Sequence, residues 1–535
     1  FFELGGDSIL SIQIVTRAAQ AGLRLTTKQL FQHQTVAELA AAAGRGEAAA
    51  AAEQGLVTGE LPLTPIQHWF FGQEMADPHH YNQSVVLEPR GEVNVRLLER
   101  ALSALLDQHD SLRLRFRRDA EGWRQRVDEG GEAVEVVRVD LSATVGAARR
   151  EALEREADRV QASLDLERGP LVRAALFEFG GGDASKLLIA IHHHAVDAVS
   201  WRVLLEDLET AYEQLRRGEA VRLPAKTTSF KRWAEALARL GQDAETSGEV
   251  EYWEAALDGA ETSLPLEESA GEDVQGDAAH VTAWLDEAET NRLLREVPGV
   301  YNTRINDVLL LALGRALGVW AAGGRVLVDV EGHGREEEAV QGVDLSRTVG
   351  WFTSLYPMAL EVGSGEIGEE LRALKERLRA VPRGGVGYGV LKYLGGAAAR
   401  RRMGRLPRAQ VSFNYLGQLD GALEREGMLA AAGESLGEPL SPRGRRSHLL
   451  GVNALVAGGR LRVSWTYGKR RHRCETIERL AESYVEELRA IIGHCLSEGA
   501  GGFTPSDFPL ANLDAEKLRK LSALVDELDV ESAQN

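Results

Sequence analysis

Three consecutive histidines, residues 192–194, are followed by Asp197, four positions after the middle one. Side chains alternate along a strand, so His192 and His194 are expected to point one way and His193 the other. An imidazole can take or give a proton near neutral pH, and Asp197 could accept an imidazole N–H or hold the loop. Two other interpretations stay open. One is a structural histidine at the end of a buried strand; the other is a zinc site, although adjacent histidines diverge and no spaced third ligand follows.

A serine at the start of a helical pattern is the second candidate for chemistry. Residues 4–8 read Leu-Gly-Gly-Asp-Ser, and apolar residues then recur at helical spacing. Ser8 is therefore expected to be an exposed hydroxyl at a helix N-terminus, where free N–H groups and the helix dipole favour a phosphate. The alternative is a plain N-capping serine.

A carboxylate at the end of a strand is the third candidate. Residues 325–330 form an apolar, strand-like run that leads directly into residues 331–336, Glu-Gly-His-Gly-Arg-Glu. The glycines allow a tight backbone there and leave Glu331 at the end of the strand. Glu331 could equally be a surface carboxylate paired with Arg335, and His333 could only brace its turn.

Helices and strands of several kinds must position these side chains. An apolar strand over residues 186–191 precedes the histidines and a helix around residues 204–215 follows them, so the histidines occupy a strand-to-helix corner. Residues 95–106 have the period of an amphipathic helix, and residues 111–116 alternate as a strand. The pattern predicts a mixed α/β fold without the regular alternation of a doubly wound sheet and without a repeat of fixed period.

Length and composition narrow the class of protein. The chain has 535 residues, too many for one ordinary core, so two to four domains are expected. Its net charge of −19 argues against a surface that binds nucleic acid or an anionic membrane. No apolar run of about 18 residues predicts a membrane span. Cys474 and Cys495 make no disulfide framework and no signal peptide opens the chain, so a cytoplasmic location is expected.

Residues 1–44 resemble a thiolation (peptidyl carrier protein) domain of a non-ribosomal peptide synthetase. In that family the serine of a Leu-Gly-Gly-(Asp/His)-Ser motif carries 4′-phosphopantetheine, and the motif maps onto residues 4–8. The resemblance therefore implies phosphopantetheine attachment at Ser8. The first helix of the family is missing, as in a fragment of a longer protein. Asp7 before the serine is typical, in the family, of carriers that feed epimerization domains.

The remainder resembles an epimerization domain of the condensation-domain superfamily, whose fold is similar to chloramphenicol acetyltransferase. His-His-x-x-x-Asp at residues 192–197 is similar to the active-site signature of the superfamily. Further motifs look like those of the epimerization branch, and the resemblance runs to about Pro509. They lie at residues 65–70, 200–208, 331–336, 347–353 and 413–418.

The fold class that the resemblance implies is α/β: a small helical carrier domain and a two-lobed, chloramphenicol-acetyltransferase-like mixed α/β domain. The expected division is a carrier at 1–44, a linker at 45–60, an N-lobe at 61–225, a C-lobe at 226–510 and a C-terminal helical tail at 511–535. The tail is interpreted as a docking segment, a linker or a frayed end.

The implied reaction is inversion, from L to D, of the α-carbon of an aminoacyl or peptidyl thioester carried on phosphopantetheine. By motif match, His193 and Glu331 are the expected acid/base pair, and which of them takes the L-proton stays open. His192 is expected to support His193, and Asp197 to orient the loop. No metal is expected.

Two further residues, Asn414 and Tyr415, are expected to line the substrate tunnel and to support Glu331 or the substrate oxygen. Two positions depart from the family. Ala198 stands where many relatives have glycine, which is tolerable if the backbone there is not left-handed, and His194 stands where an apolar residue is usual. His194 is expected to face away from the reaction centre.

The expected partners are the thioester substrate, an upstream adenylation domain and a downstream condensation domain, with no nucleic acid and no membrane. Two other functions remain as alternatives. One is a condensation domain that joins two carrier-bound substrates through the same histidine corner. The other is a non-catalytic scaffold that only binds the carrier.

Overall fold

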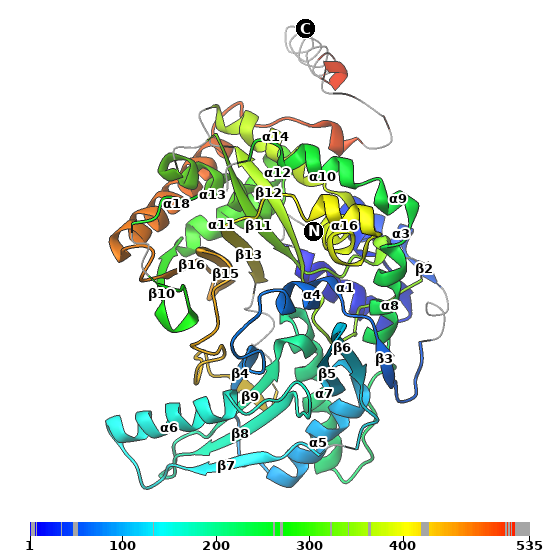
Figure 1. Ribbon diagram of the computed structural model, residues 1–535, viewed down its shortest axis with the longest axis vertical. Coiled ribbons are helices and arrows are strands. Elements are labelled where there is room, and N and C mark those ends of the chain that lie inside the picture. Colours follow the sequence, from blue (N-terminus) through cyan, green and yellow to red (C-terminus); the bar gives the residue numbers. More distant parts are fainter. Residues whose placement is uncertain are drawn as a thin grey trace.

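The computed structural model describes the chain except for residues 2–5, 7, 34, 46–51, 132, 261–262, 268–270, 322–323, 341, 362–364, 419–426, 509–510, 512–513, 515, 519 and 521–535. Most of the expected tail and part of the expected linker therefore lie outside the described residues. Two lobes follow one another along the long axis of the molecule, each built on its own sheet (Figure 1). Among the described helices, none combines the length and apolar character needed to cross a bilayer.

The N-terminal segment is helical, as its spacing predicts. Thr26 and Thr35 each begin a helix with a reciprocal capping box, because each hydroxyl accepts a backbone N–H three residues on while that residue's side chain accepts from the cap. A two-stranded antiparallel pair closes the unit. The elements are α1 (Ser8–Gln20), β1 (Leu23–Arg24), α2 (Thr27–Gln32), α3 (Val36–Ala42) and β2 (Gly44–Arg45).

The first lobe holds a mixed five-stranded sheet in the order β14-β4-β9-β8-β7, in which β14 is Leu429–Ala431, and a three-stranded sheet in the order β3-β6-β5. Helices α5 and α7 pack on one face and α6 on the other, so β9 is buried on both faces. This explains why residues 186–191 are a continuous apolar run rather than an alternating one. The elements are β3 (Gly59–Leu61), α4 (Pro65–Phe71), β4 (Asn82–Pro89), α5 (Val95–Gln108), β5 (Leu114–Asp119), β6 (Gly122–Val127), β7 (Val136–Asp140), α6 (Gly146–Gln161), β8 (Val172–Glu178), β9 (Lys186–His192) and α7 (Ala198–Arg216).

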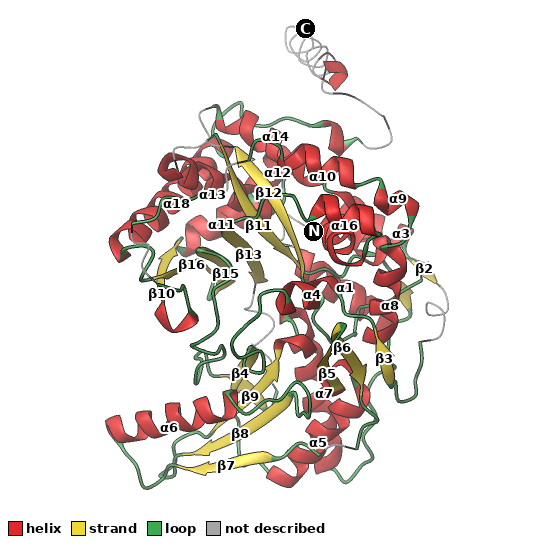
Figure 2. Cartoon of the chain, viewed as in Figure 1, coloured by secondary structure: helices red, strands yellow, loops and turns green. Residues whose placement is uncertain are grey.

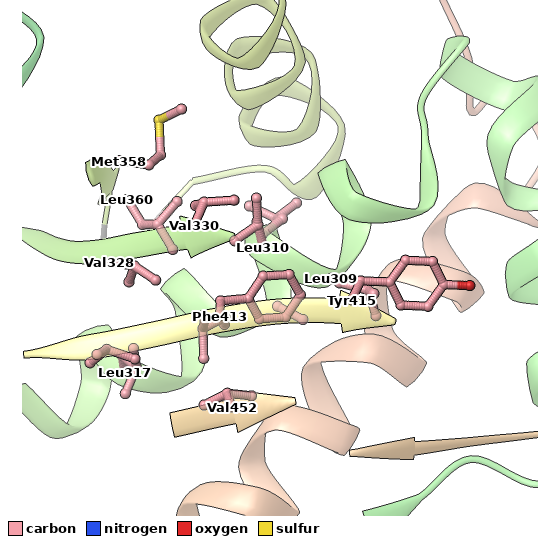
Figure 3. Packing of buried hydrophobic residues seen from close by; sticks show 14 of the residues in the cluster. Leu309, Leu310, Leu317, Val328, Val330, Met358, Leu360, Phe413, Tyr415 and Val452 are labelled. Carbon is pink, nitrogen blue, oxygen red and sulfur yellow. The ribbon is translucent and has the colours of Figure 1, made fainter. Parts of the chain in front are cut away.

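The second lobe is a mixed six-stranded sheet in the order β10-β16-β15-β13-β11-β12, with helices packed on one face (Figure 2). Helix α13 lies against the buried face of β11, β12 and β13 (Figure 3). The elements are α8 (Phe230–Leu240), α9 (Ala244–Ser247), α10 (Val250–Leu257), β10 (Ala278–Trp284), α11 (Glu287–Arg295), α12 (Val297–Tyr301), α13 (Ile305–Ala321), β11 (Arg325–Gly332), β12 (Ser354–Glu361), α14 (Ile367–Arg379), α15 (Val386–Gly389), α16 (Ala397–Met403), β13 (Val411–Gln418), β14 (Leu429–Ala431), β15 (Leu450–Ala457), β16 (Arg460–Gly468) and α18 (Cys474–Cys495).

The two lobes exchange pieces of chain. Strand β14 follows β13 of the second lobe in sequence, yet it pairs with β4 at the edge of the first lobe's sheet. Helix α8 likewise contributes Phe230 and Trp233 to the first lobe's core. Segments that follow the expected boundary at residue 225 in sequence therefore pack in the first lobe, and these shared segments hold the two lobes together.

One predicted strand is wrong in its first half. Residues 111–116 alternate in sequence, but the chain forms a 3-10 turn over Asp110–Arg113 before β5 begins. The Asp110 carboxylate accepts the backbone N–H groups of Phe230 and Lys231 at the start of α8. These tertiary hydrogen bonds favour the 3-10 conformation of this segment, and the alternation of apolar and polar residues in the sequence gives no sign of them.

Candidate active site

The histidine corner is a strand, a single 3-10 turn and a helix. Strand β9 ends at His192, the turn covers His193–Ala195, and α7 begins at Ala198. Asp197 caps α7, since its Oδ1 accepts from the Ser200 backbone N–H at 2.8 Å and from the Ser200 hydroxyl at 2.7 Å. Ala198 is the first helical residue and is absent from the left-handed residues of the described chain, so its methyl group is tolerated.

The His193 ring is held at both nitrogens. Its Nδ1 lies 2.8 Å from the Val196 carbonyl, and its Nε2 lies 3.0 Å from the Gln83 side-chain nitrogen. The Trp351 ring lies 4.2 Å away between centroids, and the Tyr81 ring is stacked at 5.7 Å. Burial lowers the pKa of His193, although the Val196 carbonyl and the Asp197 carboxylate act in the opposite direction. His193 is therefore a neutral imidazole at neutral pH.

The rings of the two neighbouring histidines stack on each other at 5.0 Å between centroids, although His193 and His194 lie in a 3-10 turn rather than in the strand. His192 contacts the Pro78 carbonyl through Nε2 at 2.9 Å, and burial lowers its pKa to about 3. His194 is fully buried in an aromatic cage, with its ring centroid 4.5 Å from those of Phe70 and Phe116. Neither ring nitrogen of His194 has a partner among the described residues, and burial holds its pKa well below the ordinary value.

Glu331 lies near the end of β11 on the open face of the sheet. Residues of β11 alternate between the core and that face, so Asp329 and Glu331 share one side. Asn414 on the parallel strand β13 donates from Nδ2 to Glu331 Oε2 at 2.9 Å. Burial raises the pKa of Glu331 to about 7; Asp329 acts in the same direction and His448 opposes it. Close to neutral pH, this carboxyl can give or take a proton.

Asn414 and Tyr415 are neighbours on β13, but their side chains lie on opposite faces of the sheet. Burial alternates along β13, so Asn414 faces the same side as Glu331 while Tyr415 packs into the core with Phe413 (Figure 3). Both residues line a small cavity that also contains Glu331. The hydrogen bond that supports Glu331 comes from Asn414, and Tyr415 contributes to the wall of the cavity.

Asp197 and Arg335 join the two halves of the site. Arg335 Nη2 donates to Asp197 Oδ1 at 3.1 Å, and both side chains are buried. Asp197 Oδ2 also accepts the Phe352 backbone N–H at 3.2 Å. Asp197 is thus engaged by the cap and by Arg335 rather than by an imidazole, and the interpretation of Arg335 as a partner of Glu331 is wrong. His333 accepts the Arg335 backbone N–H through Nδ1, as a brace of its turn does.

His193 and Glu331 line one cavity between the lobes. Its volume is about 860 Å³, and its walls also include Tyr81, Trp351 and His448. Burial and the Glu331 charge both raise the pKa of Tyr81, so its hydroxyl stays protonated and can donate a hydrogen bond. The cavity thus combines a neutral imidazole from one lobe with a titratable carboxyl from the other.

A second cavity, of about 220 Å³, extends from Glu331 to the carrier segment. Its walls include Gly6, Ala198 and His333, and Glu331 and Thr353 belong to both cavities. The carrier segment is held there by α1, which contacts β13, and by the Thr16 hydroxyl, which donates to the Ser346 carbonyl at 3.2 Å. The start of α1, where Ser8 lies, is therefore next to the cavity that reaches Glu331.

Several residues of this site were missed in the sequence. Gln83 and Tyr81 contact the His193 ring. In the second lobe, His448 contacts the Asp329 carboxylate at 2.8 Å, beside Glu331. None of them has a spacing that indicates chemistry; they reach the site through strand pairing and loops. Within the described residues no group of three or more His, Cys, Asp or Glu side chains could hold a metal ion, so the zinc interpretation finds no ligand set.

Comparison with protein families identifies two families along this chain. Residues 57–513 match the condensation domain family, and residues 1–43 match the phosphopantetheine attachment site family. The chain belongs to the condensation-domain family. The predicted order, a carrier domain followed by a domain of this superfamily, is confirmed, as are the mixed α/β fold class and 4′-phosphopantetheine as the cofactor of the carrier.

Curated relatives of this condensation domain are parts of peptide synthetases. The chain is 48% identical to a linear gramicidin synthase polypeptide of Brevibacillus parabrevis over 97% of its own length and 7% of that protein. It is 38% identical to surfactin synthase subunit 1 of Bacillus subtilis (strain 168), over 97% of its own length and 14% of that protein. The chain thus spans a small part of these relatives.

Solved structures show the same fold. The epimerization domain from the third module of tyrocidine synthetase B superposes with a TM-score of 0.77 and 35% identity, covering 83% of this chain and 99% of that one. The X-domain from teicoplanin biosynthesis superposes with a TM-score of 0.66 at 22% identity, covering 83% of this chain and 96% of that one, which shows the fold alone.

Proposed function

We propose that this condensation-family domain is an amino-acid epimerase, an isomerase that interconverts the L and D forms of an aminoacyl or peptidyl thioester carried on phosphopantetheine. One observation carries the proposal: a single cavity of about 860 Å³ is lined by neutral His193 from one lobe and by Glu331, with a pKa near 7, from the other. The likeness to an epimerization domain at 35% identity supports the same branch of the family.

The reaction needs a base on one face of the α-carbon and a proton donor on the other. A thioester acidifies the α-hydrogen, but not enough for water to remove it at neutral pH. Neutral His193 can accept that proton while the protonated carboxyl of Glu331 gives one, or the two can act in reverse. Negative charge develops on the thioester oxygen during the transfer, and the Tyr81 hydroxyl is a donor in the same cavity.

The carrier segment fits phosphopantetheine attachment at Ser8. Helix α1 begins at Ser8, and Gly6, two residues earlier, lines the cavity that contains Glu331. The arm, when attached, presents the acyl group as a thioester. We propose that an upstream adenylation domain supplies this group and that a downstream condensation domain consumes the inverted product.

The test uses the chain with Ser8 converted to the phosphopantetheinyl form and loaded with an L-aminoacyl group. Incubation in D2O is followed by hydrolysis, chiral chromatography and mass spectrometry. The expected result is deuterium uptake at the α-carbon together with the D-isomer. No D-isomer and no deuterium over hours, from a carrier shown to be fully loaded, would refute the epimerase function.

A second arm separates this function from a condensation reaction. An acceptor carrier loaded with another aminoacyl group is added to the same mixture. An epimerase leaves the acceptor unacylated, whereas a condensation domain produces a dipeptidyl thioester. Formation of that amide product without inversion would assign the histidine corner to the condensation alternative.

A further inference from the structure

Gln83 contacts both Trp201 and His193 through its side-chain amide. The Trp201 indole Nε1 lies 3.0 Å from Gln83 Oε1, and an indole N–H only donates. The Gln83 oxygen is therefore turned toward Trp201, and its NH2 group faces His193 Nε2 at 3.0 Å. Since an NH2 group only donates, Nε2 must accept.

The other side of the ring gives the same answer independently. His193 Nδ1 lies 2.8 Å from the Val196 carbonyl, which only accepts, so Nδ1 must carry the hydrogen. The neutral Nδ1–H tautomer satisfies all three hydrogen bonds at once. The Nε2–H tautomer and the imidazolium would each set an N–H against the Gln83 NH2 group.

From this chain of contacts we propose that Gln83 is a positioning residue that keeps His193 in its neutral, Nε2-basic form and disfavours its protonated form. The proposal rests on the acid/base role given to His193 under the proposed function. When His193 Nε2 takes the α-proton, the C–H bond breaks, its electron pair stays on the substrate, and the hydrogen bond from Gln83 is lost. Return of the proton to the substrate restores that bond.

Other groups also bear on the charge of His193, and they limit what Gln83 alone can do. The Asp197 carboxylate favours the imidazolium, but its buried partner Arg335 offsets its charge. Tyr81 is stacked on the ring and stays neutral. Among the described residues, His192 and His194 interact with the charge of His193, and besides Tyr81 the titratable groups that line its cavity are Glu331, His280, Glu438, Arg446 and His448.

The chain offers a matched control beside the same strand, at Gln161 at the end of α6. Gln161 is fully buried, accepts from Asn82 Nδ2 at 3.0 Å and donates to Ser84 Oγ at 3.0 Å. Asn82 and Ser84 flank Gln83 on β4, and the Gln161 amide is engaged by them rather than by His193. Gln161→Met therefore removes a buried amide beside the same strand without changing the hydrogen bonds of the imidazole.

The first measurement requires no variant and no turnover. The full chain is labelled with 15N-histidine, and His193 is assigned by comparison with His193→Gln. The expected spectrum at pH 7 is that of a neutral imidazole protonated at Nδ1. An Nε2–H tautomer or an imidazolium at pH 7 would overturn the proposal, whether or not the epimerase function holds.

The second measurement is the pH profile of α-hydrogen exchange on the loaded carrier. Gln83→Glu gives Nε2–H an acceptor, so the acidic limb should move up by about 1–3 pH units. Gln83→Met removes the hydrogen bond that favours neutral His193, so the acidic limb should move upward, by less than in Gln83→Glu. Trp201→Phe frees the Gln83 amide to turn over and should move the limb upward by less than Gln83→Glu.

Gln161→Met should leave the acidic limb in place. An unmoved limb in Gln83→Glu, or the same shift in Gln161→Met, would reduce Gln83 to a structural role. Absence of exchange in the wild-type chain would instead count against the proposed function, and the tautomer spectrum would still decide the role of Gln83.

Discussion

The histidine corner and the Glu331 strand end hold their side chains in different ways. His193 is held at both ring nitrogens, by Val196 and Gln83, and its ring lies against Trp351. Glu331 accepts a hydrogen bond from Asn414 and lies where two cavities meet. The corner therefore offers a group of fixed orientation and tautomer, whereas the strand end offers a carboxyl that faces the substrate space.

Burial acts on both groups but places the proton on one of them. A buried histidine is driven toward its deprotonated form and a buried glutamate toward its protonated form. His193 is consequently a neutral imidazole at neutral pH. Glu331, with a pKa near 7, is protonated about half of the time at that pH. At neutral pH the resting pair therefore holds one shared proton about half of the time, and this one-proton form is what a two-sided exchange at one carbon requires.

The largest expected effect comes from removing either member of the pair. His193→Ala and Glu331→Gln should each slow inversion by about 10²–10⁴-fold, the range of a positioned acid or base. Deuterium uptake and chiral analysis at pH 7 measure this. If His193 takes the L-proton, Glu331→Gln should slow inversion of the L-substrate more than its hydrogen exchange.

Two surface variants control for this result. His79→Ala changes a half-exposed histidine, and Glu361→Gln changes an exposed carboxylate paired with Arg377 at the far end of β12. Both should keep wild-type rates. Wild-type turnover in His193→Ala or in Glu331→Gln would remove that residue from the pair and leave a site with one working group.

The second prediction concerns the contact that joins the two regions. Arg335→Met leaves the buried Asp197 carboxylate without its partner and should cost about 3–5 kcal/mol of stability. Thermal and urea unfolding measure the loss. Arg443→Met, which breaks an exposed pair with Asp77, should cost about 1 kcal/mol or less. Equal costs for the two variants would mean that the Asp197–Arg335 pair does not hold the lobes together.

The third prediction is a pH dependence. The active pair carries one proton, so inversion should fall as the pH rises through the pKa of Glu331, giving an alkaline limb near pH 7. Asn414→Leu removes a donor to the carboxylate, which raises the pKa further and should move this limb upward by about 1 unit. Initial rates between pH 5 and 9 test this.

Asn453 is the register neighbour of Asn414 on β15 and lines the cavity of about 860 Å³ that contains His193 and Glu331. Asn453→Leu should leave the alkaline limb in place, because the donor that reaches the Glu331 carboxylate is on Asn414. A limb that moves downward in Asn414→Leu would contradict the role of Asn414 as a donor to the carboxylate.

The smallest expected effect is a change in stability at His194, and it is a gain rather than a loss. Its two nitrogens are buried without a partner in the described residues, so His194→Leu should stabilise the protein by about 1 kcal/mol and leave the rate unchanged. His472→Leu is a matched comparison, since both nitrogens of His472 are likewise buried without a partner in the described part of the chain, against Trp320 in the second lobe. Loss of activity in His194→Leu would show that the cage supports His193.

The same residue should affect acid stability. The pKa values of His192, His193 and His194 are lowered in the folded chain, so below about pH 6.5 the unfolded chain takes up protons that the folded chain does not. Stability that is present above pH 6.5 is lost as the pH falls, by about 1.4 kcal/mol per pH unit for each histidine. His194→Leu should make that loss less steep; an unchanged slope between pH 6.5 and 5 would contradict this.

Much of the site could be predicted from local sequence. The apolar run before the histidines, the capping Asp197 and the glycines after Glu331 each have a local physical cause, and the structure places strand, cap and turn there. The failed strand over residues 111–116 shows the limit. Asp110 is drawn into a turn by the start of α8, about 120 residues away, and alternation carries no trace of that contact.

The sequence by itself determined the types of chemical group and the elements that carry them, because periodicity, capping and glycine placement act over a few residues. Only the tertiary structure decided their partners. In the folded chain Arg335 pairs with Asp197 and not with Glu331. The pairing of β4 with β9 brings Gln83 into contact with His193. Glu331 lines two cavities. Such contacts join residues far apart in the chain, and they arise only when two lobes pack around a shared space.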